Sequence, residues 1–183
     1  YLPDYIYNIT LPAKIKLRQN KITEARQLLQ EKHDKYPKNL EIMQLYSLAL
    51  FKNGEIDKAQ KLARKTLVKD PNSLTALMVL AEACRIKNDY TCALSYWESI
   101  QKIAPQNAFA NLALIDLYAK TKNFRRLDQE IRLLYCLLGP FTLEEYIKEL
   151  TRDGNLLPYL PEMKNYLFIK KNAALSSQSM HQS

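Results

Sequence analysis

The side chains in this sequence that are best suited to chemistry are cysteines, histidines and carboxylates. Cys84, Cys92 and Cys136 are odd in number, and none stands in a Cys-x-x-Cys or Cys/His spacing that would hold a metal ion. We interpret them chiefly as buried or neutral thiols, with a disulfide or a reactive site as the alternative. His33 and His181 are far apart in the sequence and do not indicate a shared site.

Known enzyme motifs are missing from the sequence. It contains no glycine-rich phosphate loop, no His-Glu-x-x-His and no Gly-x-Ser-x-Gly. Carboxylate pairs such as Glu144-Glu145 occur, and we interpret them as solvated helix faces. The sequence therefore predicts a protein that is not an enzyme and that needs no cofactor and no metal ion.

The composition favours an all-α fold. Hydrophobic residues make up 47% of the chain, and only 3 glycines occur, whereas a sheet joined by tight hairpins needs glycine or asparagine at positive φ. No run approaches the roughly eighteen consecutive apolar residues that a membrane span requires. Because the chain begins at Tyr1, we expect it to be part of a longer protein, and cytoplasmic and periplasmic locations both stay open.

Three columns of residues recur every 34 positions. They are Pro37, Pro71 and Pro105; Ala25, Ala59 and Ala93; and Ile22, Ile56 and Tyr90, which Phe124 continues. Within each period, apolar residues recur at three- and four-residue spacing on both sides of a short polar break, such as Lys87-Asn88-Asp89. The proline ends the second segment, because proline disfavours helix in the residue before it. Each period therefore predicts two helices joined by a turn.

This pattern resembles the tetratricopeptide repeat, whose 34-residue signature is W-x2-L-G-x2-Y, then A-x3-F, then P. Residues 74–107 match best, with Leu77-x2-Leu80-Ala81-x2-Cys84, then Ala93-x3-Trp97, then Pro105. The resemblance implies an all-α, right-handed superhelical solenoid of antiparallel helix pairs. Its repeats would span residues 6–39, 40–73, 74–107 and 108–141.

Both ends of the array depart from the pattern. Pro12 falls in mid-helix by the repeat register, so we expect a short first helix that begins near it. Leu127 stands in the alanine column, which predicts wider or shifted helix packing in the fourth repeat. The period is lost after residue 141, where we expect C-terminal capping helices over 142–171 and a flexible tail over 172–183.

In the resembled family, partners lie along the concave surface made by the first helix of each repeat. By register, that surface consists of Lys14, Leu17, Arg18, Gln44, Leu48, Phe51, Lys52, Met78, Glu82, Arg85, Phe109, Leu112, Asp116 and Lys120. Apolar patches flanked by charges suit a segment of another protein, and we take Phe51 and Phe109 as the best candidates because aromatics are enriched in binding hot spots. The alternative is that Leu48, Met78 and Leu112 only pack between adjacent repeats.

One subtype of the family is disfavoured. Its chaperone-tail-binding members hold a C-terminal carboxylate with Lys and Asn side chains. The corresponding positions here are Thr10, Lys14, Leu45, Thr75 and Val79, and Lys14 alone fits.

The formal net charge of +8 is unevenly distributed. Residues 13–38 hold eight Lys or Arg and three Asp or Glu. Such a basic stretch can attract an acidic protein, a nucleic acid or an anionic membrane surface, although the nucleic-acid alternative lacks a recognisable motif. The remaining alternative is that the charge only keeps the protein soluble. Arg18, Lys52 and Lys120 also stand near predicted helix C-termini, where the helix dipole favours a cation.

Three functions follow from these observations. The first is a non-catalytic scaffold or adaptor that binds a partner segment on the concave face, and the basic charge would suit an acidic segment. The second is the interaction domain of a larger enzyme or envelope-assembly protein whose chemistry lies outside this chain. The third, which the sequence favours least, is a basic solenoid that binds nucleic acid or membrane.

Overall fold

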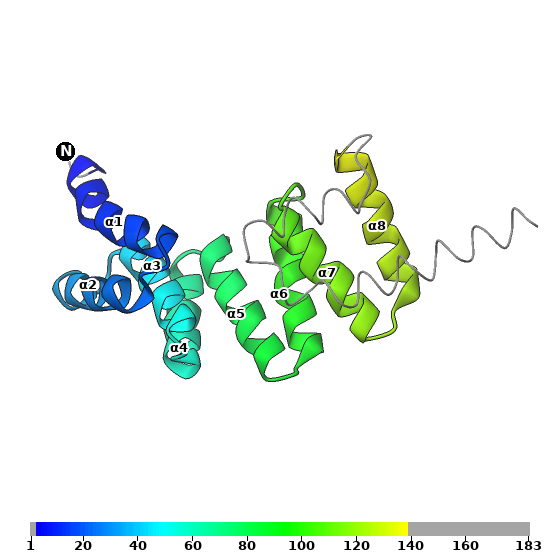
Figure 1. Ribbon diagram of the computed structural model, residues 1–183, viewed down its shortest axis with the longest axis horizontal. Coiled ribbons are helices and arrows are strands. Elements are labelled where there is room, and N and C mark those ends of the chain that lie inside the picture. The colour runs from blue at the N-terminus through cyan, green and yellow to red at the C-terminus, as the bar shows by residue number, and fades with distance from the viewer. Residues whose placement is uncertain (1–2, 139–183) are drawn as a thin grey trace, which may run out of the picture. The chain divides into compact units, whose positions relative to one another are not determined.

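The computed structural model describes residues 3–138, and this part of the chain consists of eight α-helices with no strand. The helices are α1 (Pro3–Arg18), α2 (Ile22–Lys35), α3 (Leu40–Lys52), α4 (Ile56–Lys69), α5 (Leu74–Ile86), α6 (Tyr90–Ile103), α7 (Ala108–Lys120) and α8 (Phe124–Leu138). Figure 1 shows them as successive helical hairpins. The predicted all-α fold is confirmed, and the segments expected at 142–171 and 172–183 lie outside the described residues.

The first helices of the second, third and fourth hairpins begin at side-chain caps. Asn39, Ser73 and Asn107 each precede a helix, and their side-chain oxygens accept hydrogen bonds from Ile42 N, Ala76 N and Ala110 N. These caps satisfy backbone donors that a helix N-terminus would otherwise leave unpaired. Because the three capping residues stand 34 positions apart, the repeat fixes where these helices start.

The turns inside the hairpins also follow the repeat. Asn20, Gly54, Asn88 and Lys122 have φ values of 59°, 85°, 59° and 57°. A residue at positive φ reverses the chain after a helix, and glycine and asparagine adopt this conformation at the lowest cost. These four residues are again 34 positions apart, so each hairpin closes at the same point.

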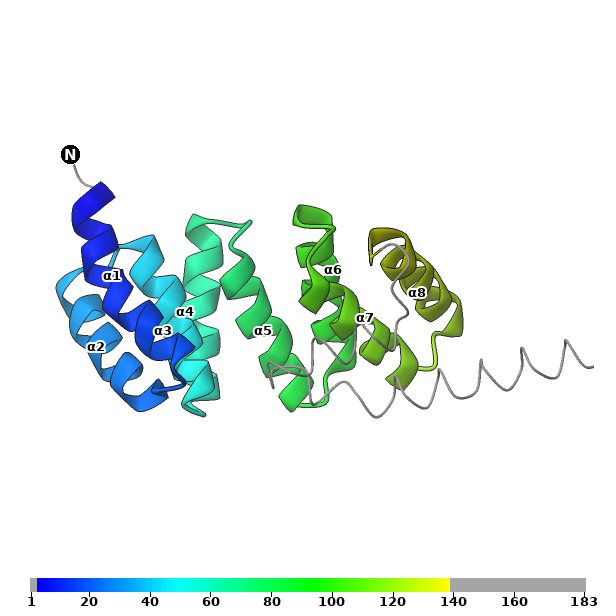
Figure 2. The ribbon, with the colours of Figure 1, turned by 45° about the horizontal axis from the view of Figure 1, so that its top comes forward.

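Residues 1–103 form one compact unit, which holds α1 to α6. Successive helices pack side by side along it (Figure 2). Ala25, Ala59 and Ala93 are fully buried, and their small side chains allow the helices to cross closely. A buried cluster between α3, α4 and α5 contains Met43, Leu50, Ala59, Leu62, Ala63, Ala76, Val79 and Leu80.

The second unit begins at Ala104 and holds α7 and α8. Residues 110–118 of α7 are buried without exception. Leu127 of α8, which occupies the alanine column, is also fully buried. Its bulk is therefore accommodated inside the unit, and the wider packing that we expected there stays a prediction.

The prediction that the first helix begins near Pro12 is wrong, since α1 runs unbroken from Pro3 to Arg18. Proline removes one backbone hydrogen bond, which costs about 3 kcal/mol in a helix interior. Contacts with α3 hold the chain on both sides of it. The buried Thr10 hydroxyl donates to Glu41 Oε1 at 2.9 Å, and Lys14 Nζ lies 2.6 Å from the same oxygen. These long-range contacts offset the local penalty.

The interpretation of the cysteines as free thiols is wrong for two of them. Cys84 in the last turn of α5 and Cys92 in the first turn of α6 form a disulfide, with Cα atoms 5.8 Å apart. The turn between the helices brings the two residues together although eight positions separate them. The side chain of Cys136 lies outside the described part.

Candidate functional site

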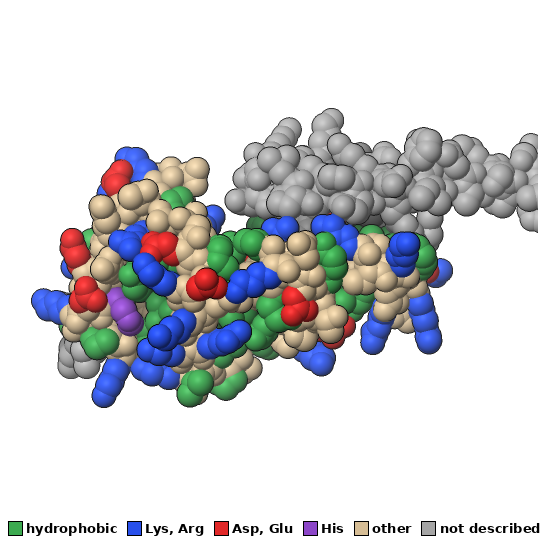
Figure 3. Space-filling model, turned by 90° about the horizontal axis from the view of Figure 1, so that it is seen from below, with side chains coloured by type: hydrophobic (Ala, Val, Ile, Leu, Met, Phe, Trp, Pro, Cys, Tyr) green, Lys and Arg blue, Asp and Glu red, His purple; other side chains and the backbone are tan. Residues whose placement is uncertain are grey.

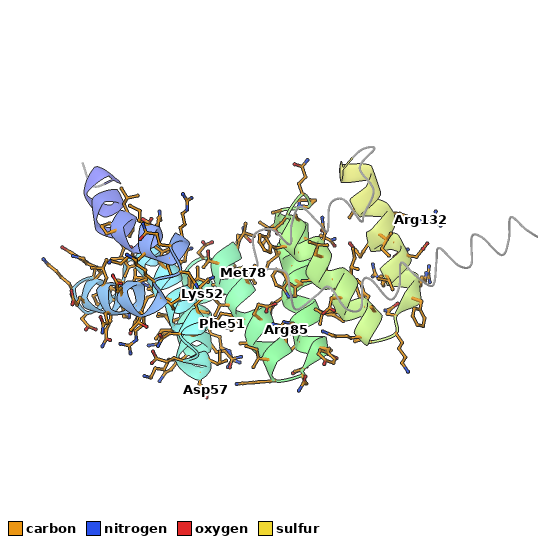
Figure 4. All side chains as sticks on the ribbon, viewed as in Figure 1. Phe51, Lys52, Asp57, Met78, Arg85 and Arg132 are labelled. Atoms are coloured by element: carbon orange, nitrogen blue, oxygen red, sulfur yellow. A yellow bond between two sulfur atoms is a disulfide. The ribbon has the colours of Figure 1, made fainter. Side chains whose placement is uncertain are left out.

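The residues predicted to contact a partner fall into both units. Those on α1, α3 and α5 form one set, which we call the first-helix face: Lys14, Leu17, Arg18, Gln44, Leu48, Phe51, Lys52, Met78, Glu82 and Arg85. Phe109, Leu112, Asp116 and Lys120 lie on α7 in the second unit. Figure 4 shows Phe51, Lys52, Met78 and Arg85 on neighbouring helices of the first unit.

The apolar members of the first-helix face are half-buried. Leu48 and Phe51 pack against the core cluster between α3, α4 and α5, and Leu17 packs against a smaller cluster with Ala13, Leu29 and Ala49. Met78 on α5 is also half-buried. Each of these side chains therefore contributes to the core and still presents some apolar surface to solvent.

Two polar members link neighbouring helices. Lys14 pairs with Glu41, which joins α1 to α3. Gln44 Nε2 donates to Ser73 Oγ at 2.9 Å, which joins α3 to the residue that caps α5. These two side chains therefore link neighbouring helices, and the role that the register predicted for them as partner contacts stays a prediction.

The remaining charges of the face differ in how they are compensated. Arg85 pairs with Glu82 on its own helix, with Nη2 2.8 Å from Oε2, and both side chains are largely buried. Arg18 and Lys52 are exposed, and among residues 3–138 neither forms an ion pair. They are the cations of this face that remain available to an acidic group.

On α7, the structure separates the predicted residues by exposure. Phe109 is 43% exposed, whereas Leu112 is 2% exposed and Asp116 is fully buried. Asp116 Oδ2 lies 2.8 Å from Lys120 Nζ one turn later. Because residues 110–118 of α7 are buried, Leu112 and Asp116 offer almost no surface to a partner.

Glu55 lies at the centre of a group of ion pairs and hydrogen bonds that the sequence did not predict. Glu55, in the turn between α3 and α4, accepts hydrogen bonds from Arg26 of α2, from Lys58 and from Asn53. The Arg26 hydrogen bond, followed by that from Lys58, lowers the pKa of Glu55 from 4.5 to about 2. The Arg26–Glu55 pair spans 29 positions in the sequence, so no local pattern indicated it.

The described residues contain no group of His, Cys, Asp and Glu side chains that could hold a metal ion. Among the helices of residues 3–138, none is both long enough and apolar enough to cross a membrane. The first-helix face of the first unit combines half-buried apolar side chains with the paired Arg85 and with the exposed Arg18 and Lys52.

A family profile described as the tetratricopeptide repeat matches residues 16–84. Similar solved structures include MamA from Desulfovibrio magneticus RS-1, at 17% identity and a TM-score of 0.65 over 94% of this chain and 98% of that one. A thermophilic tetratricopeptide repeat protein of Thermus thermophilus is 18% identical, with a TM-score of 0.61 over 72% and 73% of the two chains. PilF of Pseudomonas aeruginosa is 20% identical, with a TM-score of 0.60 over 77% and 65%. At these identities the likeness shows the fold alone. No curated protein matches this sequence.

Proposed function

We propose that this chain, whose residues 16–84 match the tetratricopeptide repeat family, is a non-catalytic adaptor that binds a segment of another protein on its first-helix face. The tetratricopeptide fold is in general a scaffold for protein–protein interaction and is generally non-catalytic. We keep the repeat division at residues 6–39, 40–73, 74–107 and 108–141 as part of the proposal.

The observation that carries this proposal is the row of partly accessible apolar side chains on α3 and α5. Leu48, Phe51 and Met78 are half-buried, so their positions are fixed by the core while part of each remains accessible. A partner side chain that packs against them meets a preorganised surface, which lowers the entropic cost of binding. The exposed Lys52 stands next to Phe51 in the sequence and adds a cation at the edge of this row.

Photo-crosslinking tests the location of the site. A photoreactive amino acid placed at Lys52 or at Met78 should capture the same partner protein, because both positions lie on the first-helix face. The matched control is Lys102, an exposed cation in the last turn of α6. Capture at Lys102 as strong as at Lys52 would show that the partner binds elsewhere.

A substitution then tests the role of the apolar row. Met78→Asp should weaken binding of the captured partner by roughly tenfold or more, because a charged group would face the apolar contact. Phe51→Ala is less suitable, since Phe51 also packs against the core cluster and its removal destabilises the unit. Met78→Leu is the control for shape, and it should keep most of the affinity.

A further inference from the structure

We propose that the outward side of α4 is a second interaction surface, separate from the first-helix face, and that it binds an acidic segment of a partner protein. We call this surface the basic row: Lys61, Arg64, Lys65 and Val68. The charge, exposure and spacing of these residues support the proposal. It does not depend on whether the first-helix face binds a partner.

The positive charge of the first unit is concentrated on one second helix. Helix α4 carries Lys58, Lys61, Arg64, Lys65 and Lys69 against the single acid Asp57. By contrast, α2 has three Lys or Arg and three Asp or Glu, and α6 has one of each. Figure 3 looks onto a face of the molecule on which Lys and Arg side chains outnumber acidic ones.

The cations of the basic row are available for binding. Lys61, Arg64 and Lys65 are exposed, and within the described part of the chain their side chains form no ion pair and no hydrogen bond. The first repeat differs, because Lys16 pairs with Glu24 and Arg26 with Glu55. The net charge of the first repeat is thus partly compensated inside the fold, whereas that of the basic row is not.

The spacing of the basic row places its members together. Positions i, i+3, i+4 and i+7 share one side of a helix, and the row extends over about 10 Å along the axis. Lys61 and Lys65 are like charges at i and i+4, an arrangement that disfavours an isolated helix. An acidic partner would relieve this repulsion, which no described acid of the protein does.

Val68 places an exposed apolar side chain at the end of the basic row. It is 85% exposed, the highest value among the large hydrophobic residues of the described part. A single exposed valine is ordinary by itself. Its place beside Arg64 and Lys65 means that a partner with an aliphatic side chain among its acids would meet both a charged and an apolar contact.

The narrowness of the row favours a protein segment over a lipid or nucleic-acid surface. The opposite side of α4 is occupied by the core, where Ala59, Leu62 and Ala63 are buried. A helix that lies in a membrane needs a broad apolar face, and single-stranded nucleic acid is held by stacking on aromatic side chains, which the row lacks. Two turns of an acidic helix, with carboxylates at three- and four-residue spacing, match it in length and charge.

The test uses a labelled helical peptide of about 14 residues, with Glu at three- and four-residue spacing and one Leu. Fluorescence anisotropy at low salt measures its affinity for the whole chain. The variant Lys61→Glu/Lys65→Glu should bind about tenfold more weakly. The control Lys21→Glu/Lys102→Glu makes the same change in net charge at exposed sites outside the row, and it should lose less than about twofold.

Further measurements distinguish binding at the basic row from unfolding and from general charge attraction. Thermal melts confirm that both variants remain folded. A peptide with Lys in place of Glu should bind the Lys61→Glu/Lys65→Glu variant better than the unaltered protein, and Val68→Ser should weaken the acidic peptide less than the double variant does. Equal loss in the row and control variants, or no binding of the acidic peptide to the unaltered protein, would overturn the proposal. So would row-dependent binding of phosphatidylserine vesicles or of single-stranded DNA that exceeds binding of the peptide.

Discussion

Helices α2 and α4 occupy the same place in successive repeats, yet they differ in what they present to solvent. Both are 14 residues long, and their inward sides are alike, with Ala25 and Ala59 fully buried at the same register position. Outward, α2 carries balanced charges, and its Arg26 is held by Glu55. Helix α4 carries a row of uncompensated cations. The repeat therefore fixes the inner side of a second helix and leaves the charge of its outer side free to vary.

The largest effect should come from enlarging the buried alanines on the inner sides of α2 and α4. Ala25→Leu and Ala59→Leu should each lower the free energy of unfolding by roughly 1–3 kcal/mol, because added methylenes overpack a close helix crossing. Urea denaturation measures both. Lys61→Leu on the outer side of α4 is the control, and it should change stability by no more than about 0.5 kcal/mol. A helix α2 that accepted leucine without loss would show that the two inner sides are not equivalent.

The next largest effect should come from removing the ion pair between Arg26 of α2 and Glu55. Glu55→Gln should cost about 1–2 kcal/mol at neutral pH, a value reduced from the full pKa shift because the carboxylate is partly exposed. The pKa of Glu55 is lowered to about 2, so its contribution is complete above about pH 4.5 and is lost as the pH falls towards 2.

Acid titration of stability checks the sign. The unaltered protein should lose stability between pH 4.5 and 2 more steeply than Glu55→Gln does. The matched change on α4, Lys61→Gln, should change the stability by no more than about 0.5 kcal/mol and should leave the slope between pH 4.5 and 2 unchanged, since Lys61 forms no ion pair with a described residue. An equal cost for Lys61→Gln would contradict the contrast between paired and unpaired cations.

The smallest expected effect is a change in the pKa of His33 on α2 when a cation of α4 is removed. Burial lowers the pKa of His33 on α2 from its ordinary value of 6.5, Asp34 raises it, and Lys65 and Lys69 of α4 lower it further. Lys65→Gln should therefore raise the pKa of His33, whereas Lys61→Gln should raise it less. Because the folded protein disfavours protonated His33, stability from this group falls as the pH drops below 6.5, and Lys65→Gln should reduce that loss. NMR titration of the imidazole measures the shift.

Most of the fold could be predicted from the sequence, because it follows from residues that repeat every 34 positions. The proline and alanine columns indicate the helices, and the caps at Asn39, Ser73 and Asn107 follow the same period. The course of α1 through Pro12 could not be predicted in this way. It depends on Thr10 meeting Glu41, a contact between residues 31 positions apart that carries no local signature.

The candidate site was less predictable, since register does not report burial or pairing. Leu112 and Asp116 hold the same register positions as half-buried residues of α3 and α5, yet both are buried. The total charge of residues 13–38 likewise does not distinguish paired from free cations, because Lys16 and Arg26 pair with acids. The free cations lie on one face of α4 instead. The disulfide was only an alternative among the predictions, because the cysteine spacings match no known motif, although Cys84 and Cys92 flank one predicted turn.

Ser73 accepts two hydrogen bonds, one from the helix that it caps and one from a helix of the hairpin before it. Its hydroxyl oxygen accepts from Ala76 N to start α5 and also receives a hydrogen bond from Gln44 of α3. When α3 is absent, the Ser73 rotamer that caps α5 loses a support, so nucleation of α5 is less favourable. We therefore expect prior folding of the second repeat to promote folding of the third.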